Sequence, residues 1–122
     1  MSPTFIHGRL ATTALLFILF MAAWGFWRYF RKGGLDSSYW GALVIGEILI
    51  LVQGALGAYL WLSGLRPDRG IHFLYGVAAA LVIPGVWAFT KGRQERREML
   101  IYALMLLFLV GLLLRAMGTA GT

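Results

Sequence analysis

The sequence predicts an all-α membrane protein whose four transmembrane helices form an antiparallel up-down bundle. Of its 122 residues, 60% are hydrophobic and only 13% are charged, and the mean hydropathy is +0.76. The apolar residues gather into four blocks, each close to the ~20 residues that a helix needs to cross a bilayer. Short charged or glycine-rich breaks separate the blocks, so consecutive helices should be antiparallel neighbours. We expect a single domain over residues 1–122, with helices at about 5–31, 38–64, 70–91 and 95–117.

The first apolar block runs from about Arg9 to Phe30. Ser2 and Pro3 suit the N-cap and the first turn of a helix, which would then carry His7 in its opening turns. The block lacks a basic segment before it, and a basic cluster follows where a signal peptide would be cleaved. We therefore expect a retained helix.

The second block, from Tyr39 to Ser63, contains Glu47, the one acidic residue inside a predicted span. A carboxyl group within the membrane needs a partner or a role. We favour a neutral or hydrogen-bonded side chain that faces the bundle interior, over a proton-coupled role. Gln53 is expected to form a hydrogen bond between helices and not to act as a ligand.

The third block runs from Ile71 to Thr90, and Pro84 should kink it because proline cannot donate a hydrogen bond to the carbonyl of Ala80. The fourth block, from Met99 to Met117, has Tyr102 as its one polar side chain before Arg115 and is interpreted as a wall that faces lipid or a partner. The charged run over residues 93–98 is interpreted as a solvated cap of that helix.

The positive charges indicate topology. The net charge of +6 could suggest nucleic acid, but the eleven Lys and Arg residues lie at the ends of the apolar blocks, so we expect the lipid bilayer and no nucleic acid as the partner. Seven of them fall on one side, and four on the other, namely Arg9, Arg66, Arg69 and Arg115. Because positive loops stay in the cytoplasm, this predicts a multi-pass protein of the cell inner membrane with both termini outside.

Two histidines form the constellation that could carry chemistry. His7 opens the first helix and His72 opens the third, and these helices run parallel in an up-down bundle, so both imidazoles fall on the same side at similar depth. Two imidazoles from separate helices can be the axial ligands of heme iron. Gly76, one turn after His72, and Ala11, one turn after His7, would leave room for the macrocycle.

The four arginines of the outer side share the face on which heme propionates would need cationic partners. The chain has no cysteine, which excludes thiolate metal sites and covalent heme attachment. The alternative is that these are ordinary interfacial residues, because histidine and arginine are common at membrane surfaces.

Four short motifs also resemble the repeated half of the heme A synthase family over about residues 5 to 80. They are His7-Gly8-Arg9, Gln53-Gly54-Ala55-Leu56-Gly57, Leu62-Ser63-Gly64-Leu65 and Ile71-His72-Phe73. In that family each half opens with a histidine followed by arginine and continues through a Gln-bearing helix to a second heme-ligating histidine. The resemblance implies a heme b bound by His7 and His72.

This chain also departs from the family. The family enzyme has two such halves in eight helices, whereas this chain has one. Its catalytic half places a glutamate about a turn before the first histidine, where Pro3 or Thr4 stands here, and it often has a pair of outer cysteines. The resemblance therefore implies a single heme-binding bundle, alone or as a homodimer, without the machinery that oxidises heme.

Three functions remain open from the sequence. The leading hypothesis is an integral-membrane heme-binding protein for electron transfer or heme handling. The alternative is a heme-free accessory subunit of a larger respiratory or photosynthetic membrane complex. A small dimeric exporter ranks last, because such exporters usually carry their essential glutamate in the first helix, which has no acidic residue here. Whether the protein is an enzyme stays open.

Overall fold

The computed structural model describes residues 2–64 and 70–119, and within them it contains four α-helices and no strand. The helices are α1 (Pro3–Phe30), α2 (Ser37–Leu62), α3 (Ile71–Thr90) and α4 (Arg96–Thr119). All four are long and apolar enough to cross a membrane. The predicted all-α bundle is confirmed, and each helix begins and ends within two residues of the expected position.

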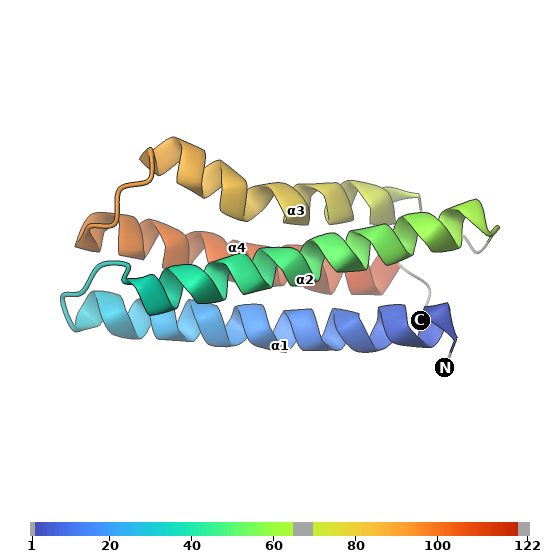
Figure 1. Ribbon diagram of the computed structural model, residues 1–122, viewed down its shortest axis with the longest axis horizontal. Helices are drawn as coiled ribbons and strands as arrows, with labels where there is room; N and C mark the ends of the chain where they lie inside the picture. Colours follow the sequence, from blue (N-terminus) through green and yellow to red (C-terminus); the bar gives the residue numbers. More distant parts are fainter. Residues whose placement is uncertain (1, 65–69, 120–122) are drawn as a thin grey trace.

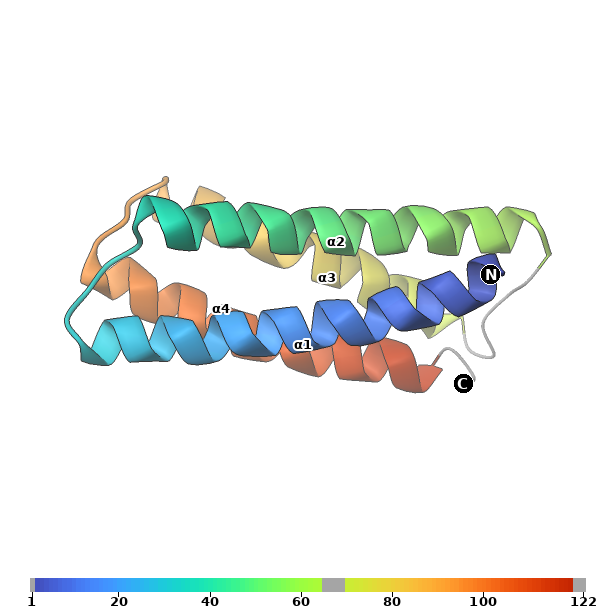
Figure 2. The ribbon, with the colours of Figure 1, turned by 60° about the horizontal axis from the view of Figure 1, so that its bottom comes forward.

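The helices form a four-membered bundle in which α1 and α3 lie diagonally opposite one another (Figures 1 and 2). α4 packs closely against both α1 and α3, and α2 contacts the same two helices from the other side. The contacts of α2 are fewer, above all with α3. α1 begins and α4 ends at the same end of the bundle (Figure 2). Because it makes the fewest contacts with its neighbours, α2 is the most loosely held helix.

The core lies along α4. Met99, Tyr102, Leu106 and Leu109 of α4 are fully buried. On α1 and α2 the matching buried side chains are Ile18, Met21, Tyr39 and Leu43. The expectation that α4 is a wall facing lipid or a partner holds for its exposed face, which carries Leu104, Leu107 and Phe108, and not for this buried face. In a membrane both lipid-facing and core positions are apolar, so composition did not show that α4 holds the centre of the bundle.

Local sequence explains the helix boundaries. The hydroxyl of Ser2 accepts a hydrogen bond from Phe5 N at 3.1 Å, and Pro3 occupies the first turn, as predicted. The Asp36 carboxylate caps α2 in the same way, at 2.8 Å from Tyr39 N. α3 ends where Lys91 takes a left-handed conformation, and it contains Pro84. Figure 1 shows that α3 is not straight.

Polar contacts join the α1–α2 and α3–α4 connections at what we call the basic end, formed by residues 28–36 and 91–98. Leu35 N donates to Gln94 O at 3.0 Å, and Arg96 Nε donates to Tyr29 O at 2.9 Å. The Arg96 guanidinium also lies 4.0 Å from the centre of the Tyr29 ring. These contacts fasten the two hairpins to one another.

Glu98 shows that the charged run is not wholly a solvated cap. Its side chain is buried, and its carboxylate lies 3.4 Å from Arg93 Nε and 3.6 Å from Arg97 Nε. Both arginines remain exposed. The interpretation of the run as solvated is therefore wrong for Glu98.

Candidate functional site

The two histidines meet at the end of the bundle opposite the basic end. The centres of the His7 and His72 rings are 6.3 Å apart, and the ring planes are inclined at 73°. They come from the diagonal helices α1 and α3, whose backbones do not contact one another. The two rings therefore lie beside one another between these helices, in an edge-to-face arrangement. We call this the histidine site.

The imidazole of His72 is oriented by α4. Its Nδ1 lies 2.6 Å from the carbonyl oxygen of Ala116. A carbonyl only accepts, so Nδ1 must carry the proton in this hydrogen bond, and the lone pair of the neutral ring then resides on Nε2. The ring centre of Phe73 lies 6.0 Å from that of His72. Phe73 also packs edge-on against Trp61, with their ring centres 4.4 Å apart. His72 thus has the tautomer of a metal ligand that binds through Nε2.

The backbone and ring of His7 contact α2. Gln53 Nε2 donates to the backbone oxygen of His7 at 2.7 Å, which confirms the predicted hydrogen bond between helices. A Cβ atom added at Gly57 would lie 3.5 Å from His7 Cε1, in ordinary van der Waals contact, so the ring lies beside α2 at this residue. Gln53 therefore holds the backbone of His7, and Gly57 lies next to its ring.

Two buried polar atoms beside this contact have no hydrogen-bond partner among the described residues. They are His7 Nδ1 and Gln53 Oε1. A ring that binds a metal through Nε2 carries a proton on Nδ1, which is a donor, and an amide oxygen is an acceptor. The two atoms would therefore be complementary in hydrogen-bonding character when His7 binds a metal through Nε2.

The other expected site residues are placed more loosely. The Arg115 guanidinium donates to Tyr75 Oη at 3.5 Å, and the Arg9 side chain is exposed near the start of α1. Gly76 is exposed, and an added Cβ would meet no neighbouring heavy atom within 4 Å. Arg66 and Arg69 lie outside the described residues.

The donor set decides what kind of metal group the site suits. Among the described residues there is no group of three or more His, Cys, Asp or Glu side chains that could hold a metal ion. A bare transition metal needs about four ligands. Heme iron takes four nitrogens from its porphyrin, so two imidazoles complete its coordination.

The separation of the rings fits the same group. A metal–imidazole bond of about 2.0 Å places each ring centre about 3.1 Å from the metal. Two imidazoles that ligate one metal from opposite sides then have centres about 6.2 Å apart. The observed 6.3 Å agrees with that spacing. Two axial rings are also free to differ in rotation about their metal bonds, so the 73° inclination is compatible.

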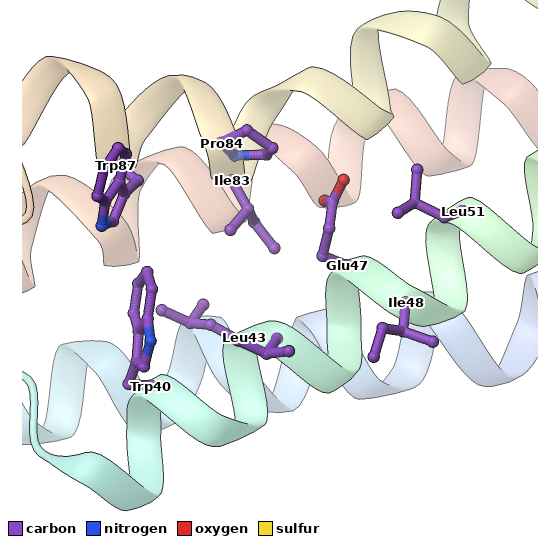
Figure 3. Close-up of a pocket in the computed structure, with 9 residues that line it drawn as sticks. Trp40, Leu43, Glu47, Ile48, Leu51, Ile83, Pro84 and Trp87 are labelled. Atoms are coloured by element: carbon purple, nitrogen blue, oxygen red, sulfur yellow. The ribbon is translucent and has the colours of Figure 1, made fainter.

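Glu47 is not part of the histidine site and lies in a groove between α2 and α3 with a volume of about 420 Å³ (Figure 3). Glu47 Oε1 is buried and has no hydrogen-bond partner among the described residues. The expected hydrogen bond of this carboxyl group is thus not formed through Oε1. The groove was not foreseen, because it depends on how far α2 stands from α3.

Comparisons with models of protein families, with curated proteins and with solved structures found no match to this chain.

Proposed function

We propose that this chain is an integral-membrane heme-binding protein that holds heme b between His7 and His72 and serves electron transfer or heme handling. The observation that carries the proposal is the 6.3 Å separation of two imidazoles contributed by diagonal helices. The orientation of His72 by the Ala116 carbonyl supports it, since ligating histidines characteristically donate their other ring nitrogen to such an acceptor. The short motifs that resemble half of a heme A synthase agree with it.

Four of the described residues would hold the heme. His72, oriented from α4, and His7, positioned from α2, would be the two axial ligands. Arg9 and Arg115 lie at the same end of the bundle and would be the cationic partners of the propionates. When bound, the heme iron supplies one-electron redox chemistry.

The ligand set also favours a carrier over an oxidising enzyme. If His7 and His72 both held the iron, no coordination position would remain open to oxygen or to a substrate. The position of the family's catalytic glutamate is occupied here by Pro3 or Thr4, which carry no carboxyl group. Electron transfer or heme handling is the chemistry that remains.

An absorption spectrum tests the proposal. The protein is purified in detergent, supplemented with heme, and measured as a reduced-minus-oxidised difference, with pyridine extraction to identify the heme. We expect the sharp bands of a low-spin heme in the parent protein and their loss in His7→Ala and His72→Ala. Added imidazole should restore them in either variant, because free imidazole can enter the space left by the deleted ring.

The control is Gln94→Ala, which changes an exposed side chain at the basic end and should keep the spectrum. A folded, monodisperse parent protein without a Soret band would refute the proposal. That result would leave the heme-free accessory subunit, which predicts that neither histidine variant changes the protein's assembly with a larger complex.

We also propose the orientation that the positive charges predict, with both termini outside the inner membrane and the basic end in the cytoplasm. The charges at the basic end are gathered in two short connections, which is where the positive-inside rule applies most strongly. Fusions of alkaline phosphatase and of green fluorescent protein to the C-terminus test it. Phosphatase activity without fluorescence is the expected result, and the reverse pattern would overturn the orientation.

A further inference from the structure

The groove between α2 and α3 is a second feature with the properties of a binding site. Its walls are almost entirely apolar, and the residues used below are Trp40, Glu47, Leu51, Pro84 and Trp87. Figure 3 shows the indoles of Trp40 and Trp87 on facing walls and the Glu47 carboxyl projecting from α2 toward α3. A volume of about 420 Å³ is within the range of small-molecule sites.

The carboxyl of Glu47 requires a partner that the described residues do not supply. Oε1 is buried without a hydrogen bond, and neither α2 nor α3 contains a Lys or Arg that could pair with it. A carboxyl group left unsatisfied at membrane depth is costly, so such residues mark functional sites. Pro84, on the opposite wall, also cannot donate to the carbonyl of the residue one turn earlier.

These features restrict the chemistry of an occupant. It must be mostly apolar, because the walls are apolar and the groove lies in the membrane-spanning part of α2 and α3. It must carry a polar atom that pairs with a carboxyl group. A lipid acyl chain has no such atom. A planar molecule that pairs with Glu47 can extend toward the two indoles, since Trp40 lies seven residues, about 10 Å, from Glu47 along α2.

We propose that this groove binds the ring of a lipid-soluble quinone or quinol, with the Glu47 carboxyl hydrogen-bonded to a ring oxygen. A carboxyl group can both donate and accept, so it can pair with a quinone carbonyl and with a quinol hydroxyl. This inference extends the proposed function, because it names a class of electron carrier that reaches the protein through the bilayer. The redox role of the bound quinone rests on the proposed function.

The groove lies near the histidine site along α2. Glu47 and Gln53 are six residues apart, which is about 9 Å along a helix axis. Gln53 contacts His7, so α2 connects the two sites through less than two helical turns. A ring bound at Glu47 would therefore be close to a heme held at the histidines.

Binding is tested with decylubiquinone, titrated into the protein in lipid nanodiscs and followed by quenching of tryptophan fluorescence. Saturable quenching is expected, and Trp87→Phe should remove part of it. Glu47→Leu should weaken binding about 10-fold, whereas Glu47→Gln, which keeps hydrogen-bonding atoms, should stay within about 3-fold of the parent. Decylbenzene, which has no ring oxygen, should not compete.

Two matched substitutions control for general effects. Leu51→Phe narrows the groove and should weaken binding, whereas Leu104→Phe makes the same change on α4, outside the groove. The two leucines are equally exposed, at 53% and 51%. If Glu47→Leu does not fold, the Leu51→Phe and Glu47→Gln variants still decide the question.

Three results would overturn the inference. The first is non-saturable partitioning that is equal in all variants. The second is binding that neither Glu47→Leu nor Leu51→Phe alters. The third is displacement of decylubiquinone by tetraphenylphosphonium in the parent but not in Glu47→Gln, which would indicate a cation site. The heme spectrum of the same samples separates the two proposals. Quinone binding without heme binding would refute the proposed function alone. Heme binding without quinone binding would refute this inference alone.

Discussion

Gly25 of α1 is expected to be one of the least replaceable small residues in the bundle. A Cβ atom built at this position would lie 2.7 Å from Tyr39 Oη and 3.2 Å from Ala103 Cβ. The tyrosine cannot simply withdraw, because it is fully buried and its hydroxyl donates to Met21 O at 2.7 Å. Gly25→Ala must therefore break that hydrogen bond or push α1 away from α2 and α4.

The magnitude follows from opposing contributions. Overpacking costs about 1–3 kcal/mol, and a hydrogen bond between membrane helices contributes about 0.6 to 1.7 kcal/mol. Alanine regains up to about 1 kcal/mol through its higher helix propensity. We expect Gly25→Ala to lower the free energy of unfolding by about 1–2 kcal/mol. Gly41→Ala, where an added Cβ meets nothing within 4 Å, should be neutral or slightly stabilising.

A double-mutant cycle tests the stated cause. Tyr39→Phe removes the hydroxyl that collides with the new methyl group, so the double variant Gly25→Ala/Tyr39→Phe should be more stable than the sum of the single effects by about 1 kcal/mol. The assay is reversible unfolding in mixed detergent and dodecyl sulfate micelles, followed by circular dichroism. Additive effects, or a Gly25→Ala variant as stable as Gly41→Ala, would refute the reasoning.

Three further predictions follow from the same contacts. Gln53→Leu should weaken heme binding about 10-fold in a heme titration, because it removes the bond that positions His7; unchanged affinity would contradict that role. Glu98→Leu should lower the free energy of unfolding by about 1–2 kcal/mol, since it removes the carboxylate shared by two arginines, and Glu98→Gln should lose less. Gly34→Ala should cost about 3 kcal/mol or more, because its Cβ would overlap the Gln94 carbonyl oxygen, and wild-type stability in the unfolding assay would show that this loop contact is dispensable.

The positions of the helices could be predicted from the sequence because the physics behind them is local. Apolar blocks of membrane-spanning length and short connections fix four antiparallel helices. The same reasoning places His7 and His72 at one end, since α1 and α3 are separated by one antiparallel helix and therefore run parallel. The sequence contains no comparable signal for how closely side chains of the diagonal helices approach one another, so the contact between the two rings depended on packing.

The errors have one origin, namely that burial within the bundle depends on distant segments. Tyr102 and its neighbours on α4 look the same as lipid-facing residues, because the bilayer and the core have similar polarity. Glu98 lies among charged residues in the sequence, and its burial depends on the folded structure at the basic end and not on its sequence neighbours. The Glu47 groove likewise reflects how loosely α2 packs on α3.

The helices are joined by different contacts at the basic end and at the histidine end, and this difference has a consequence for cofactor loading. At the basic end, loop contacts hold all four helices in register, whereas at the histidine end α2 is joined to α1 through Gln53 and to α3 through the contact of Trp61 with Phe73. Moving α2 outward at the histidine end would break these contacts and leave those of the basic end intact. A wide planar molecule could enter between the rings after the chain has folded in the membrane, so folding and cofactor loading need not be simultaneous.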